Sequence, residues 1–114
     1  MPQIYRNDDR ATVVRKIIQS IEQHNPGLFR AVTVEHEPGE PFRPDVSLFE
    51  GENDTPTINL VIETELSIVA KTVAERWIAL SATGNLDIFA PKNYAARAKT
   101  LIRRYDVKAR LIEY

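Results

Sequence analysis

The amino-acid sequence predicts an α/β protein with a central mixed five-stranded sheet flanked by helices, in the order αβββαβαβ. Segments with strand-like apolar patterns alternate along the chain with segments whose apolar residues recur at helical spacing. A leading hairpin pair followed by two crossover helices requires both antiparallel and parallel strand pairs. The length of 114 residues fits one domain and is too short for two. We therefore expect a single domain over residues 1–114.

The first predicted element is a helix over about residues 9–24. Asp8 or Asp9 is suited to cap its start, and the sequence Asn25-Pro26-Gly27 is expected to end it. Its apolar residues form one stripe that has to be buried. The stripe contains Val13, Val14, Ile17, Ile18 and Ile21.

Three predicted strands follow this helix. Residues 29–37 alternate between two faces, which is typical of a strand with one wet face. A second strand covers about 44–49. Residues 58–62 are almost wholly apolar, as in a central strand buried on both faces, and the strand is expected to continue through 63–65.

The second half of the chain alternates helices with strands. We expect helices over about 67–82 and 92–105, and strands over 86–90 and 107–113. The first of these helices places Trp77 at helical spacing with Val73 and Leu80, which predicts a core position. The apolar stripe of the second contains Tyr94, Ala98, Leu101, Ile102 and Tyr105.

Composition excludes several classes of protein. The chain has no cysteine, so disulfide scaffolds, cysteine nucleophiles and thiolate metal sites are ruled out. No apolar run approaches the roughly 20 residues that cross a bilayer, and the first ten residues lack the apolar stretch of a signal peptide. We expect a soluble, intracellular (cytoplasmic) protein without a membrane partner.

The formal charge of −1 is unevenly distributed. Residues 1–57 are net acidic and residues 58–114 net basic, which points weakly to a polyanionic partner such as nucleic acid. Basic residues lie opposite the apolar stripe of the last helix, where they either contact nucleic-acid phosphates or form a solvated helix face. They are Arg97, Lys99, Arg103 and Arg104.

Acidic residues mark the second and third predicted strands. Glu63 and Glu65 are two residues apart, so both side chains of a continuing strand point the same way. If these strands form an antiparallel hairpin, Asp45 converges with them at one end of the sheet. Such acids either hold a divalent cation or are simply solvated, and Glu65 can also pair with Lys71.

Two segments resemble the motif of the PD-(D/E)XK nuclease superfamily. They are Arg43-Pro44-Asp45-Val46 and Val61-Ile62-Glu63-Thr64-Glu65. That family has a Pro-Asp at the start of one strand and an acid-x-lysine on the next. Its core order, αβββαβ, matches the first six predicted elements. The resemblance implies the restriction-endonuclease-like fold.

The resemblance also implies roles for individual residues. Asp45 and Glu63 match the metal-binding acids of the family, and Glu22 lies where many members keep a further acid. Glu65 stands where the family has its catalytic lysine, and Lys71 is a candidate for a lysine that has migrated. Glu65 is then a further metal ligand or orients the attacking water. The implied activity is phosphodiester hydrolysis assisted by Mg²⁺ or Mn²⁺.

Three functions are compatible with these observations. The first is a metal-dependent nuclease that cuts DNA or RNA. The second is a catalytically degenerate nuclease-like domain that binds nucleic acid or protein, which the missing lysine favours. The third is an unrelated α/β interaction domain. A homodimer, formed through the edge of the last strand or through a helix face, is a further hypothesis.

Overall fold

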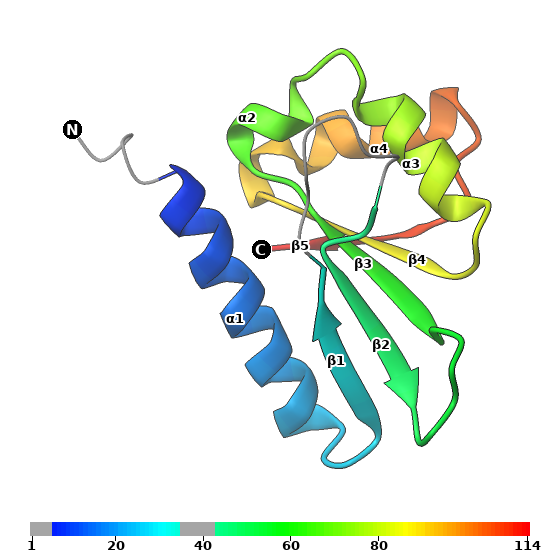
Figure 1. The fold of residues 1–114 in the computed structure, drawn as a ribbon. Helices are drawn as coiled ribbons and strands as arrows, with labels where there is room; N and C mark the ends of the chain where they lie inside the picture. The colour runs from blue at the N-terminus through cyan, green and yellow to red at the C-terminus, as the bar shows by residue number, and fades with distance from the viewer. Residues whose placement is uncertain (1–5, 35–42) are drawn as a thin grey trace.

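A computed structural model describes residues 6–34 and 43–114 of the chain (Figure 1). The helices are α1 (Arg6–His24), α2 (Glu65–Ile68), α3 (Val73–Ser81) and α4 (Ala95–Arg104), with a short 3₁₀ helix, η2 (Lys92–Tyr94), before α4. The strands are β1 (Phe29–Thr33), β2 (Val46–Glu50), β3 (Ile58–Ile62), β4 (Leu86–Ala90) and β5 (Arg110–Glu113). Among the helices described, none is long and apolar enough to cross a membrane.

The five strands form one mixed sheet in the order β1-β2-β3-β4-β5. The pairs β1–β2 and β2–β3 are antiparallel, while β3–β4 and β4–β5 are parallel. Parallel neighbours need a crossover, and the helices between β3 and β5 provide it. The predicted α/β class with a five-stranded mixed sheet is therefore confirmed.

Helices cover both faces of the sheet (Figure 1). The apolar stripe of α1 packs on the face that carries Leu48, Leu60 and Ile62. The other helices cover the opposite face, where side chains of α2, α3 and α4 surround Val61 and Ile88. Alternate residues of β3 thus face different layers, which explains why its sequence is almost continuously apolar.

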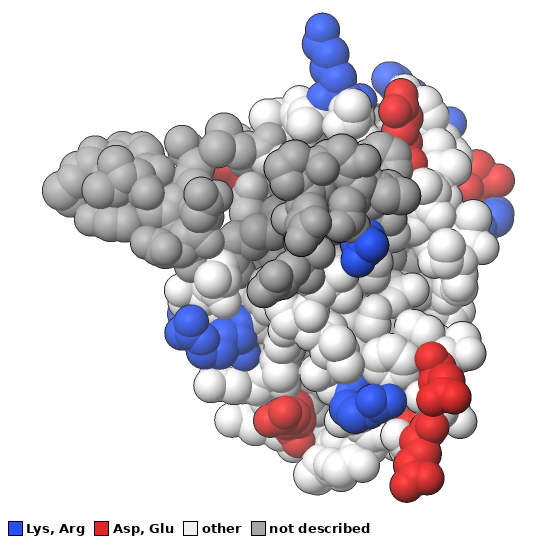
Figure 2. All heavy atoms as spheres, in the orientation of Figure 1, with Lys and Arg blue, Asp and Glu red and all other residues white. Residues whose placement is uncertain are grey.

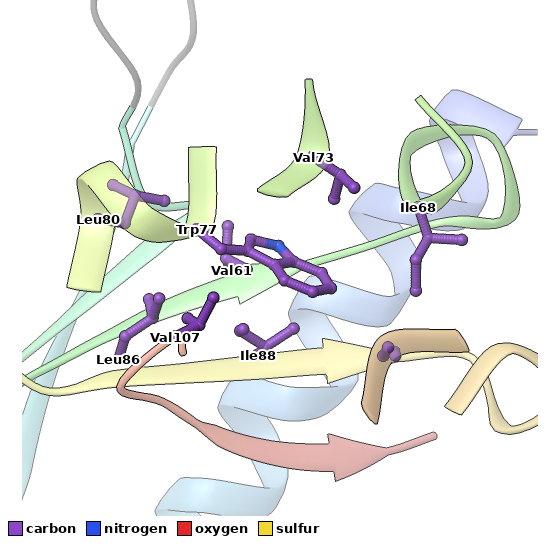
Figure 3. Close-up of a cluster of buried hydrophobic side chains, with 10 residues drawn as sticks. Val61, Ile68, Val73, Trp77, Leu80, Leu86, Ile88 and Val107 are labelled. Carbon is purple, nitrogen blue, oxygen red and sulfur yellow. The ribbon is translucent and has the colours of Figure 1, made fainter. Parts of the chain in front are cut away.

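Trp77 occupies the core between α3 and the sheet (Figure 3). Its side chain is fully buried, which confirms the predicted core position. Figure 3 shows the indole lying over β3 and β4, near Val61 and Ile88. A buried indole brings a large apolar surface and one N–H group that needs a hydrogen-bond partner.

The predicted single helix over 67–82 is wrong, because the structure contains two helices there. Thr64 caps α2, since its Oγ1 accepts the Ser67 N–H at 3.1 Å while the Ser67 Oγ accepts the Thr64 N–H at 2.7 Å. The chain then turns through residues 69–72 and starts again as α3, with Thr72 at its N-terminal boundary. The periodic apolar residues on both sides of this turn concealed the break.

Other predicted boundaries also shift. Helix α1 already begins at Arg6, so Asp8 and Asp9 are helical residues rather than caps. Strand β1 ends at Thr33, and residues 35–37 of the predicted strand lie outside the described part. Strand β5 begins only at Arg110, because the Val107 N–H still bonds to the Ile102 carbonyl of α4, at 3.0 Å.

Replacing Ile88 tests this core. The side chain is fully buried in β4, so Ile88→Ala should lower the free energy of unfolding by about 3 kcal/mol through lost burial and the cavity left behind. Urea denaturation measures this. Ile78→Ala is the matched control, because Ile78 is 44% exposed on α3 and should change stability by less than about 1 kcal/mol. Equal losses in the two variants would contradict the packing described.

Candidate functional site at the end of strand β3

Glu63 is a fully buried acidic residue at the carboxyl end of β3. Strand β3 ends at Ile62, and the Glu63 N–H bonds to the Phe89 carbonyl of β4 at 2.8 Å. This backbone bond continues the pairing of β3 with β4. Because side chains alternate along a strand, Glu63 shares the face of Val61, which packs against α2 and α3. A buried carboxylate without partners costs several kcal/mol. Its surroundings therefore determine whether this arrangement is stable.

Three side chains donate hydrogen bonds to the Glu63 carboxylate. The Arg76 Nη2 atom lies 2.5 Å from Oε1 and 2.6 Å from Oε2. The Trp77 Nε1 atom donates to Oε2 at 2.7 Å. The Ser67 Oγ donates to Oε1 at 2.5 Å. Both carboxylate oxygens are thus engaged, and the guanidinium neutralises the charge.

The backbone of Glu63 is also fixed. Its carbonyl oxygen accepts a hydrogen bond from the Tyr114 hydroxyl, at 2.5 Å. The Tyr114 N–H bonds to the Ala90 carbonyl at 2.9 Å, which attaches the residue after β5 to the end of β4. The carboxyl ends of the three parallel strands are therefore joined around Glu63.

Asp45 immediately precedes β2 and is buried beside β3. Its Oδ2 accepts the Ile62 N–H at 2.6 Å, and its own N–H bonds to the Leu60 carbonyl at 2.8 Å. The antiparallel register, with Val46 opposite Leu60, puts Asp45 and Glu63 at the same end of the sheet. Because side chains alternate along a strand, both residues are on the sheet face that α2 and α3 cover.

Glu65 does not join this pair. The expectation that Glu63 and Glu65 point the same way from a continuing strand is wrong, because β3 ends at Ile62 and Glu65 begins α2. Glu65 is exposed, whereas Glu63 is buried. It lines a hollow of about 300 Å³ together with Lys16 of α1 and Tyr114.

Two other predicted residues are not among the described contacts of Glu63. Lys71 is exposed in the turn between α2 and α3, and no described contact joins it to Glu65. Glu22 is exposed near the end of α1, which leads into the start of β1. Strands β1 and β3 run in the same direction, so Glu22 is at the opposite end of the sheet from Glu63.

The arrangement does not fit a divalent cation at Glu63. Mg²⁺ binding requires carboxylate oxygens that are free to coordinate, and both oxygens of Glu63 accept bonds from protein donors. Within residues 6–34 and 43–114, no three or more acidic, histidine or cysteine side chains gather where they could hold a metal ion. With the present side-chain positions, Arg76 supplies the positive charge that a metal would provide.

The predicted phosphate-binding residues lie on α4. Lys99, Arg103 and Arg104 are exposed. Arg97 is exposed as well, but its Nε donates to the Ile68 carbonyl at 3.2 Å and so fastens α4 to α2. On the face shown in Figure 2, by contrast, basic and acidic side chains are interspersed.

A second hollow, of about 510 Å³, lies between α1 and the sheet. Its floor includes Leu60 and Phe89, and its rim carries Asp87 and Arg110. Arg110 donates to both oxygens of Asp87, at 3.2 and 2.6 Å. The hydrogen bond to Asp87, and then the charge of that carboxylate, raise the pKa of Arg110 above its usual value. This ion pair fastens β5 to β4.

Sequence reasoning missed the partners of Glu63. Trp77 was assigned to the core without a partner for its N–H group, although a buried indole requires one. Arg76 adjoins Trp77 in the same helix, but nothing in its spacing distinguishes it from a surface arginine. Ser67 is near Glu63 in the sequence but also takes part in the cap of α2. Tyr114 is far from Glu63 in the sequence. The contacts of both residues with Glu63 therefore become visible only in the folded chain.

Comparisons with known proteins find no matching protein-family model, no similar curated protein and no similar solved structure.

Removing Arg76 should strongly destabilise the fold. In Arg76→Met the fully buried Glu63 loses its cationic partner, and the free energy of unfolding should fall by about 3 kcal/mol. Urea denaturation provides the measurement. In Glu63→Gln/Arg76→Met the buried residue is neutral, so the double variant should be more stable than Arg76→Met alone. Losses that simply add would show that the two side chains do not depend on each other.

Proposed function

We propose that this chain is a nucleic-acid-binding domain with restriction-endonuclease-like architecture that does not cleave its ligand. The observation that carries the proposal is the state of the Glu63 carboxylate. The acid that matches a metal ligand of the nuclease superfamily is fully buried and bonded to Arg76, Trp77 and Ser67. A carboxylate held in this way stabilises the fold and is not available to a catalytic metal.

The order of the elements supports the architecture. An antiparallel β1-β2-β3 sheet follows α1, and β4 then returns parallel to β3 after helices on one face. This agrees with the αβββαβ core of the superfamily. Glu65 in place of the motif lysine agrees with a loss of catalysis, because that lysine normally helps to activate the attacking water.

The exposed cations of α4 support the ligand. Lys99, Arg103 and Arg104 project from one helix, and the described part of α4 contains no acidic side chain. Ala95 and Ala98 are buried against the core and present small side chains there. The helix therefore sits firmly on the sheet while its long cationic side chains remain in solvent, where they attract phosphates.

Loss of two α4 arginines should weaken binding. Arg103→Ala/Arg104→Ala removes two phosphate contacts, so affinity for a labelled oligonucleotide should fall about tenfold at 0.1 M salt. The slope of log affinity against log salt should also become shallower by about one to two units. Fluorescence anisotropy over a salt series measures both quantities.

The matched control is Arg15→Ala/Lys16→Ala, which removes an adjacent pair of exposed cations from α1 instead. Its affinity should stay within about twofold to threefold of the parent chain. If the two double variants lose the same affinity, binding depends on overall charge rather than on α4. If the parent chain binds neither DNA nor RNA, the proposed function is wrong.

A metal-dependent nuclease is the second candidate function. It is favoured by Asp45 and Glu63 lying at one end of the sheet, with Lys16 and Glu65 lining a hollow beside that end. In this function Asp45 and Glu63 would hold Mg²⁺ or Mn²⁺, which requires Arg76 to leave Glu63.

A homodimer remains a proposal too, because β5 is an edge strand of the described sheet.

Nuclease activity separates the two candidates. With Mn²⁺ and plasmid, single-stranded DNA or RNA, the parent chain should release no more product than Asp45→Ala. Gel assays over several hours detect slow cleavage, and a preparation of Asp45→Ala made in parallel controls for contaminating nucleases. Cleavage by the parent chain that disappears in Asp45→Ala would replace the binding proposal with the nuclease.

A further inference from the structure

Tyr105 is an exposed aromatic residue at the end of α4. Its side chain is 46% exposed, the highest value among the aromatic side chains that the structure describes. The sequence places it on the apolar stripe of the helix. Tyr94, at the other end of the same stripe, packs against the core. Tyr105, by contrast, is accessible at the surface.

The backbone around Tyr105 is held on both sides. The Tyr105 N–H bonds to the Leu101 carbonyl at 3.0 Å, which continues the last turn of α4. Asp106 then adopts a positive φ of 51°, and Val107 returns to the core with its N–H bonded to the Ile102 carbonyl. A ring carried on such a fixed turn loses little freedom when it contacts a ligand.

Two cations directly precede Tyr105 in the sequence. Arg103 and Arg104 lie in the last turn of α4 and are exposed, which offsets the negative end of the helix dipole. The carboxylate of Asp106 is paired with Lys108 at 3.1 Å, so it does not leave an unbalanced negative charge beside Tyr105. The end of α4 therefore combines an aromatic face with a net positive charge.

We propose that Tyr105 stacks on an unpaired base of a single-stranded polynucleotide, while Arg103 and Arg104 contact its phosphates. This inference rests on the proposed nucleic-acid binding and names the kind of ligand. Every base has a π-face, so an exposed ring on a helix end that also carries cations binds single strands with little sequence preference. In a duplex the faces of the bases are stacked on each other and are not accessible to such a ring.

Two variants of Tyr105 test the stacking. Tyr105→Phe keeps the aromatic ring, whereas Tyr105→Leu keeps an apolar side chain without a π-face. Fluorescence anisotropy is measured with labelled 15-mers of oligo-dT and oligo-U, and with a mixed-sequence duplex of equal length. Tyr105→Leu should lose about fivefold to a hundredfold in affinity for single strands, and Tyr105→Phe should stay within about twofold. Duplex affinity should not change in either variant.

A third variant reports contact directly. Tyr105→Trp places a second indole at an exposed position, while Trp77 stays fully buried. Oligo-dT or oligo-U should quench the emission of the new indole, and the duplex should not. The DNA and RNA strands share the stacking chemistry, so their relative affinities identify which polymer the surface prefers. Thermal unfolding of each variant verifies that the fold is intact.

The outcomes separate this inference from the proposed function. Binding by the parent chain that is insensitive to Tyr105→Leu, or that favours the duplex, overturns the stacking and leaves nucleic-acid binding in place. An absence of binding to all three oligonucleotides overturns both. Loss in Tyr105→Leu, retention in Tyr105→Phe and quenching in Tyr105→Trp together support the stacking.

Discussion

The hydrogen bonds of the buried Glu63 residue join the end of β3 to α2, α3 and Tyr114. A buried acid is tolerated only when donors replace the water it has lost. Here the donors are Ser67 from α2 and Arg76 and Trp77 from α3, and Tyr114 binds the carbonyl of the same residue. One residue at the end of β3 therefore contacts α2, α3 and the residue that follows β5. Without these partners the buried charge would oppose folding instead of organising it.

This arrangement also constrains the chemistry. A carboxylate has about four lone-pair sites, and those of Glu63 accept four hydrogen bonds from Ser67, Arg76 and Trp77. Arg76 is largely buried and forms an ion pair with Glu63, so the carboxylate charge is balanced within the fold. Asp45 accepts the Ile62 N–H through its Oδ2 atom. Both acids therefore have hydrogen-bond partners within the fold.

The surface of α4 follows from how that helix is held. Small residues, Ala95 and Ala98, face the core, and Arg97 bonds to the Ile68 carbonyl of α2. The helix is fixed on the sheet layer by contacts that leave Arg103, Arg104 and Tyr105 in solvent. The same network that joins α2 and α3 to Glu63 thereby supports the helix that carries the proposed binding surface. A rigid base of this kind orients side chains more precisely than a loop does.

The pattern of residues alone was enough to predict the α/β class, the strands β3 and β4, and the core position of Trp77, because periodicity and continuous apolar runs depend only on which faces are buried. It also indicated that Asp45 and Glu63 meet at one end of the sheet, since antiparallel pairing brings the start of β2 beside the end of β3. The break between α2 and α3, the separation of Glu65 from Glu63, and the position of Glu22 at the far end of the sheet became visible only in the folded chain. The cap at Thr64 starts a short α2 where the apolar periodicity predicts one longer helix. The direction of α1 sets the end of the sheet at which Glu22 lies. The bonds from Arg76 and Tyr114 to Glu63 join residues that are 13 and 51 positions apart. Such bonds leave no local pattern in the sequence, because they form only once the elements have packed.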